Sequence, residues 1–112
     1  MLTPDELKKL AEFCGHKFAL VNTCPCIWDE KLERWQDWHP DTSIEQAFMV
    51  ADKIPNGERE SYVVHLCHEL GLSTKHINHH NGLEAIYFLI HANAEQRCAA
   101  ALATQKEKLD AT

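Results

Sequence analysis

Cysteine and histidine are the residues of this chain whose types and spacing could support metal chemistry, because thiolate and imidazole are ligands that zinc prefers. Cys24 and Cys26 form one close pair, and His65 and Cys67 form a second. On a strand, His65 and Cys67 would share one face, so both could reach the same ion. A structural zinc site takes four ligands, usually as two close pairs. These four residues are therefore the candidate metal ligands.

The spacing of the first pair counts against zinc. A single residue, Pro25, separates the two cysteines, whereas about two to four residues separate the paired ligands of common zinc sites. No Cys-x-x-Cys motif completes the set. The alternative is that Cys67 is a small core residue and that the histidines of segment 76–80 are solvated. We therefore predict no cofactor and keep zinc as the alternative.

The sequence indicates no catalytic site. Nucleophilic catalysis needs a nucleophile, a base and an oxyanion hole, and no glycine-rich or elbow motif positions a Cys or a His for this. Cys14 and Cys98 fall on apolar helix stripes, which predicts that they are buried. The chain has only four glycines and no phosphate-binding loop motif. We expect a protein that is not an enzyme.

Three tryptophans lie close together in the segment 28–38. Tryptophan is enriched in the centre of protein interfaces, although burial in the core is the commonest use of a large aromatic side chain. At least one of the three is expected in the core of so small a domain. The predicted contact surface combines this segment with the histidine segment. Its partner-binding residues are Trp28, Arg34, Trp35, Asp37, Trp38, His79 and His80.

Composition limits the possible partners. A chain of 112 residues with 45% hydrophobic and 25% charged residues is typical of one soluble globular domain, here residues 1–112. The net charge of −6, without a Lys/Arg cluster, argues against non-specific nucleic-acid binding and against binding to an anionic membrane. Five cysteines cannot all pair within the chain, and no leader or membrane-spanning apolar run is present. We therefore expect a cytoplasmic protein.

The first half of the chain predicts two helices and one strand. Thr3 and Glu6 form a capping box that starts a helix, which ends at Gly15. A strand is expected over 17–21, followed by a tight turn at Cys24–Cys26. The segment 29–37 could form a turn of helix or an irregular loop, and we favour the loop. A second helix is expected to begin at Thr42, with Glu45 as its capping-box partner.

The second half predicts two strands and a closing helix. Apolar residues alternate over 61–68, and β-forming residues fill 83–90. A polar loop is expected between them, over 71–82. Asn93 caps the last helix, with Gln96 completing the capping box. The element order is thus α-β-loop-α-β-β-α, an α+β fold in which three helices pack with a small antiparallel sheet.

Two segments resemble a family of small phage and prophage proteins, the ABA-sandwich or α-β-α domain. In the first, Trp38-His-Pro-Asp-Thr-Ser-Ile-Glu-Gln-Ala-Phe48, a proline and a Thr/Ser cap lead into a helix. The second, Ala92-Asn-Ala-Glu-Gln-Arg-Cys-Ala-Ala-Ala-Leu102, is similar to the family's closing helix. The family has no general activity. The resemblance implies a phage or prophage origin in a bacterial host and a non-enzymatic accessory role.

The leading hypothesis is therefore a small phage-encoded protein that inhibits a host protein or protein complex, in particular a defence component, by stoichiometric occupation. The first alternative is an oligomeric protein that sequesters a nucleotide signal, with Tyr62 or Tyr87 stacking on the base and Arg59 or Arg97 meeting phosphate. The second alternative is a small structural zinc module. Native mass combined with metal analysis separates the three, and the oligomeric state stays open.

Overall fold

The computed structural model describes residues 2–72 and 82–110, of which 82–85 are described by their backbone alone. Three consecutive strands follow the first helix, and the other described elements are helical. In chain order the elements are α1 (Pro4–Phe13), β1 (Phe18–Val21), β2 (Cys24–Asp29), β3 (Arg34–Asp37), α2 (Ile44–Asp52), the 3₁₀ turn η1 (Asn56–Glu58), α3 (Arg59–Glu69), α4 (Gly82–Ile90) and α5 (Ala94–Asp110).

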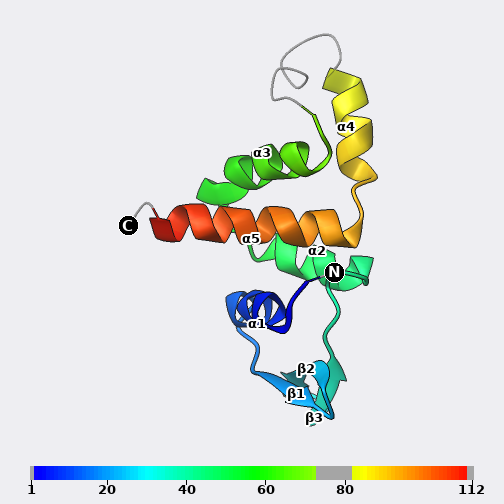
Figure 1. Cartoon of the computed structure of the whole chain (residues 1–112), viewed down its shortest axis with the longest axis vertical. Helices are drawn as coiled ribbons and strands as arrows, with labels where there is room; N and C mark the ends of the chain where they lie inside the picture. Colours follow the sequence, from blue (N-terminus) through cyan, green and yellow to red (C-terminus); the bar gives the residue numbers. More distant parts are fainter. Residues whose placement is uncertain (1, 73–81, 111–112) are drawn as a thin grey trace.

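Helix α5 lies at the centre of the molecule (Figure 1). Helices α1 and α2 pack on one side of it, and α3 packs on the other. The antiparallel sheet, with strand order β1-β2-β3, lies beyond α1 at one end of the long axis, and α4 stands at the opposite end. The predicted α+β fold with a small antiparallel sheet is confirmed. None of the described helices is long and apolar enough to cross a membrane.

The order of the elements differs from the predicted α-β-loop-α-β-β-α. All the described strands precede α2, and the described segments that follow it are helical. The sheet is therefore one compact unit of consecutive hairpins, because each strand pairs with the next strand along the chain. Two short hairpin turns are enough to build it, and no distant segment has to join.

The first helix follows the sequence closely. The Thr3 side chain accepts a hydrogen bond from the Glu6 backbone N–H at 3.2 Å, and Glu6 accepts one from the Thr3 N–H at 3.0 Å, so the predicted capping box is present. Leu7 and Leu10, one turn apart, are buried. Gly15, with φ +80°, ends the helix in the left-handed conformation that glycine adopts without strain.

The sheet occupies segments where the sequence predicts a turn and a loop, so both of these predictions are wrong. Residues 24–26 begin β2, and residues 34–37 form β3. Asn22 and Thr23, with φ 52° and 67°, make the two-residue turn that joins β1 to β2. Strand β3 carries no apolar alternation because all four of its residues are exposed, so the pattern on which strand prediction depends is missing.

Helix α2 begins later than predicted. Ser43 rather than Thr42 is the N-cap, and its hydroxyl accepts a hydrogen bond from the Gln46 N–H at 3.3 Å. The side chain of Gln46 does not close a capping box. It accepts a hydrogen bond from the His39 N–H at 2.6 Å and donates one to the Asp37 carbonyl at 2.8 Å, so it fastens the helix start to the end of β3.

The two predicted strands at 61–68 and 83–90 are wrong, because these segments form α3 and α4. In α3, Tyr62 and Leu66 are buried one turn apart, and Cys67 is buried beside Leu66. An alternating apolar pattern that contains residues at i and i+4 fits a helix as well as a strand. The packing of α3 against α5 favours the helix over the strand. Most of the predicted polar loop, residues 73–81, lies outside the described residues.

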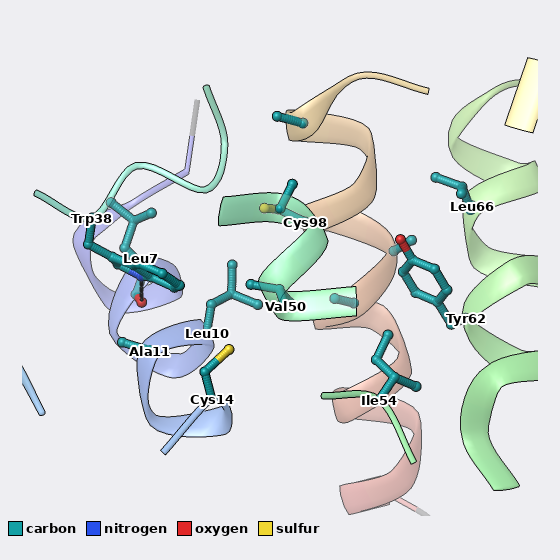
Figure 2. Close-up of a cluster of buried hydrophobic side chains, with 14 of the residues drawn as sticks. Leu7, Leu10, Ala11, Cys14, Trp38, Val50, Ile54, Tyr62, Leu66 and Cys98 are labelled. Atoms are coloured by element: carbon teal, nitrogen blue, oxygen red, sulfur yellow. Dashed lines mark hydrogen bonds between the residues drawn. The ribbon is translucent and has the colours of Figure 1, made fainter. Parts of the chain in front are cut away.

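The core joins α1, α2, α3 and α5, and Trp38 is its largest fully buried side chain. Figure 2 shows Trp38 beside Leu7 of α1, with Val50 and Cys98 deeper between the helices. The indole N–H of Trp38 donates a hydrogen bond to the Leu7 carbonyl at 3.0 Å. The only polar atom of the side chain is thereby satisfied, so its burial carries no unpaired donor.

The closing helix is confirmed with its predicted capping box. The Gln96 N–H donates to the Asn93 side chain at 2.8 Å, and the Asn93 N–H donates to the Gln96 side chain at 3.0 Å. Cys98 is fully buried on the stripe of α5 that faces α1 and α2. Cys14 is buried as well, so both helix cysteines lie where the sequence predicted.

Candidate functional site

Alternation along β2 brings Cys24 and Cys26 to one face of the sheet, which we call the outer face. Asp37 lies directly opposite Cys26 in the register between β2 and β3. His39 follows two residues after Asp37, and Trp38 between them points into the core. The outer face therefore gathers two thiols, a carboxylate and an imidazole.

Cys24, Asp37 and His39 lie close to one another, and Cys26 lies next to Asp37. The Cys24 Sγ lies 3.6 Å from the Asp37 Oδ1 and 3.9 Å from the His39 Nε2. The Cys26 Sγ lies 3.9 Å from the same Asp37 oxygen. The ligand atoms of Cys24, Asp37 and His39 all fall within 4.8 Å of one another, the spacing of a group that could hold a metal ion.

The electrostatics of this group oppose thiolate formation when no cation is present. Desolvation, then the Asp37 carboxylate, then Cys26 raise the pKa of the Cys24 thiol. Within the part of the chain that the structure describes, no ion pair to a lysine or arginine neutralises Asp37. These residues are thus a poor nucleophilic site but a suitable set of cation ligands.

The second candidate metal pair, His65 and Cys67, lies elsewhere. Both are on α3, Cys67 is fully buried, and His65 forms an ion pair with Glu107 of α5. Residues two positions apart on a helix point in nearly opposite directions, so these two do not form a pair of ligands. The candidate set of Cys24, Cys26, His65 and Cys67 is therefore not brought together, because one pair lies on β2 and the other on α3.

Trp28 and Trp35 face each other across β2 and β3 on the outer face. Their rings meet edge to face with centroids 5.3 Å apart. Trp35 is 40% exposed, and Arg34 and Asp37 are exposed as well. Their part in binding a partner stays a prediction, and Arg34 lies on the opposite face of the strand from Trp35.

Including Trp38 in the predicted contact surface was wrong, because its side chain is fully buried and cannot reach a partner. It is instead the core tryptophan that the sequence predicted among the three. His79 and His80 lie outside the described residues, so their part in the predicted surface stays a prediction.

A second candidate surface, which the sequence did not predict, lies away from the sheet, beside α4. A cavity of about 380 Å³ opens between α2, α3, α4 and α5, and we call it the apolar groove. Apart from one arginine, apolar and aromatic side chains line it. They are Phe48, Tyr62, Val63, Leu66, Ile86, Leu89, Ile90 and Arg97.

Several groove residues are unusually exposed for their type. Ile90 is 66% exposed, Ile86 is 50% exposed and Phe48 is 47% exposed. Tyr87 and Phe88 of α4 are exposed as well. The sequence signal that could have identified this surface is the run Ile86-Tyr-Phe-Leu-Ile90, which is apolar on every side and cannot bury all its residues on one helix face.

Arg97 holds α4 in the position that forms the groove. Its guanidinium donates hydrogen bonds to three carbonyls at the end of α4, those of Leu89, Ile90 and Ala92, at 3.1, 3.0 and 3.0 Å. The same group lies 4.8 Å from the centre of the Phe48 ring. Arg97 therefore caps the C-terminal end of α4, where a positive charge is favourable, and joins it to α2 and α5.

Most of the candidate nucleotide-binding residues are buried or bonded to other parts of the chain. Tyr62 and Arg97 are buried, and the Nε of Arg59 donates to the Ile54 carbonyl at 3.3 Å. A ring available for stacking is left only at Tyr87, which is 59% exposed. The arginines hold the chain itself together rather than forming an open phosphate site.

No protein-family model matches this chain, and no curated protein or solved structure matches it either. The resemblance of segments 38–48 and 92–102 to phage ABA-sandwich proteins therefore stays a prediction.

Proposed function

We propose that the protein is a non-enzymatic binding protein that occupies a partner protein, with the apolar groove as its main contact surface. The observation that supports this proposal is the exposure of large apolar side chains from three helices around one groove. Small monomeric proteins rarely leave such residues exposed together, and contiguous apolar patches mark interaction sites.

The shape of the groove favours a particular kind of partner segment. Helices α3 and α4 both contribute apolar side chains to its lining, and among the described residues that line it Arg97 is the only charged one. An apolar helix face fits such a surface, because anchors one turn apart can enter it in sequence. Burying one fully exposed Ile or Phe side chain contributes about 1.5–3 kcal/mol, so the loss of one such anchor should weaken binding by about 10- to 150-fold.

The identity of the partner is proposed on the phage resemblance alone. On that basis the partner is a host protein or protein complex, in particular a component of a defence system, and the protein inhibits it by stoichiometric occupation. The outer face with Trp28 and Trp35 is a second contact surface of the same kind.

Affinity capture from a bacterial lysate, quantified by mass spectrometry, tests the proposal. Ile90→Glu places a charge in the groove, and Leu32→Glu is the matched control because Leu32 is 58% exposed in the turn before β3. We expect Ile90→Glu to reduce capture of the specific partner by about 30-fold, since a loss of about 2 kcal/mol corresponds to that factor. Leu32→Glu should capture as much as the unchanged protein.

Titration of the purified partner then measures stoichiometry. A fixed molar ratio that does not change with time supports occupation, whereas depletion of the partner by sub-stoichiometric protein would show turnover and contradict the proposal. Trp35→Ala separates the two surfaces. If it abolishes capture while Ile90→Glu does not, the outer face rather than the groove is the contact surface.

A further inference from the structure

The sheet brings four potential metal ligands together in two pairs of the same form. Cys24 and Cys26 are two residues apart on β2, and Asp37 and His39 are two residues apart at the end of β3. Residues two apart on extended backbone point to the same side, and the register places Asp37 opposite Cys26. Each strand thus presents two ligands to the same point.

The distances between the ligand atoms suit a tetrahedral ion. Zinc–sulfur bonds of about 2.3 Å and zinc–nitrogen or zinc–oxygen bonds of about 2.0–2.2 Å, at tetrahedral angles, separate neighbouring ligand atoms by about 3.5–3.8 Å. The Cys24 Sγ lies 3.6 Å from the Asp37 Oδ1 and 3.9 Å from the His39 Nε2, and the Cys26 Sγ lies 3.9 Å from the Asp37 Oδ1. The ligand atoms of Cys24, Asp37 and His39 all lie within 4.8 Å of one another, and Cys26, which contacts Asp37, completes the set when its side chain turns toward His39.

Backbone hydrogen bonds already fix the second pair. The Trp38 N–H donates to the Pro25 carbonyl at 2.9 Å, which ties the end of β3 to β2 between the two cysteines. Gln46 holds the His39 N–H and the Asp37 carbonyl from the start of α2. The ligands are therefore held before an ion arrives, and binding orders little further chain.

We propose that Cys24, Cys26, Asp37 and His39 form a tetrahedral site for one Zn²⁺ ion. Two sulfur ligands and one imidazole favour zinc over Mg²⁺ or Ca²⁺, which prefer oxygen ligands alone. Binding releases one proton from each cysteine, and the bound site, with two thiolates and a carboxylate around Zn²⁺, carries a net charge of −1. This proposal is independent of the apolar groove, because α4, which helps to line the groove, lies at the opposite end of the molecule from the sheet (Figure 1).

The role of the ion is structural. All four positions are filled by protein side chains, so no position is left for substrate. The ligands lie at the start of β2, at the end of β3 and in the segment that enters α2, so the ion joins the sheet to the helices. Because a sheet of three short strands buries little apolar area, this connection stabilises the part of the fold that needs it most.

Zinc analysis and cobalt substitution of the reduced full chain test the site. After metal removal and reconstitution, we expect one equivalent of Zn²⁺ to survive gel filtration. Co²⁺ should give the intense visible bands of tetrahedral coordination together with a thiolate charge-transfer band. His39→Ala should weaken Zn²⁺ binding by at least about 100-fold, a loss greater than that of a group which only orients a ligand. His65→Ala is the matched control and should bind as the unchanged protein does.

Three results would overturn the proposal. The reconstituted protein could retain no Zn²⁺, the Co²⁺ complex could lack the thiolate band, or His65→Ala could lose the ion while His39→Ala keeps it. Should His39→Ala fail to fold, Asp37→Asn keeps the shape of the side chain and must also weaken binding. The cobalt spectrum of the unchanged protein shows whether thiolates bind the ion, so this test needs no variant.

Discussion

Replacing Arg97 with Lys should loosen α4 and destabilise the whole protein. Arg97 donates hydrogen bonds to the Leu89, Ile90 and Ala92 carbonyls and lies against the Phe48 ring. Lysine keeps the positive charge, but its compact ammonium group cannot reach three carbonyls that are arranged around a planar guanidinium. At least two carbonyls would therefore lose their charged donor in a region where Arg97 is only 9% exposed.

The magnitude follows from these contacts. A hydrogen bond to a charged group contributes about 1.5–3 kcal/mol net, and the stacking on Phe48 adds about 0.5–1 kcal/mol. Water can reach part of the exposed end of α4, which reduces the loss. We expect Arg97→Lys to lower the free energy of unfolding by about 2–4 kcal/mol, which corresponds to a fall of about 8–17 °C in Tm for a chain of this size.

Urea unfolding followed by circular dichroism measures the loss, and amide hydrogen exchange locates it. Exchange should accelerate first in α4, because the capped end opens before the core does. Phe48→Leu is the matched control, since it removes the ring contact and keeps all three hydrogen bonds, so it should cost about 1 kcal/mol. An Arg97→Lys protein with an unchanged urea midpoint and unchanged α4 exchange would refute the capping role.

Three further measurements check other parts of the structure. Asn93→Ala should lower the free energy of unfolding by about 1 kcal/mol through the lost N-cap of α5, and an unchanged Tm would show that this cap contributes nothing. In metal-free protein a thiol reagent should modify the half-exposed Cys24 first and Cys98 last, because Cys98 is fully buried and burial raises its pKa to about 12; faster labelling of Cys98 would contradict its placement. The hydrogen bond from His65 lowers the pKa of Glu107. This bond therefore stabilises the folded state fully above the ordinary glutamate pKa of about 4.3, and the stabilisation is lost as the pH falls through the lower pKa of the folded state. Glu107→Gln should flatten this acid limb of the unfolding curve, and an unchanged limb would contradict the linkage.

The starts of α1 and α5 were predictable because their signals are local. The capping residues Thr3 and Asn93 each bond to a residue three positions later, so the sequence alone contains both partners. The nature of α3 was not predictable in this way. Val63, Val64 and the alternation around them favour a strand, and only packing against α5 decides for a helix.

The candidate metal site was half predictable for a similar reason. The sequence identifies Cys24 and Cys26 by residue type, but only on a strand does a spacing of two positions make both side chains point to the same face. Asp37 and His39 were missed as ligands because the segment was predicted to be a loop, in which the same spacing does not imply a common direction. Recognising β2 and β3 as a hairpin would have paired the two motifs.

The central place of α5 has a consequence for how the chain comes to be folded in a cell. A ribosome makes a protein from its N-terminus, so α1, α2 and α3 all exist before the helix that each of them packs against. Their apolar faces have no common partner until residues 94–110 emerge, and the core can close only then. Closure of this core thus waits for the synthesis of α5, and a separately made peptide of residues 93–110, which keeps the N-cap Asn93, should restore structure to residues 1–92.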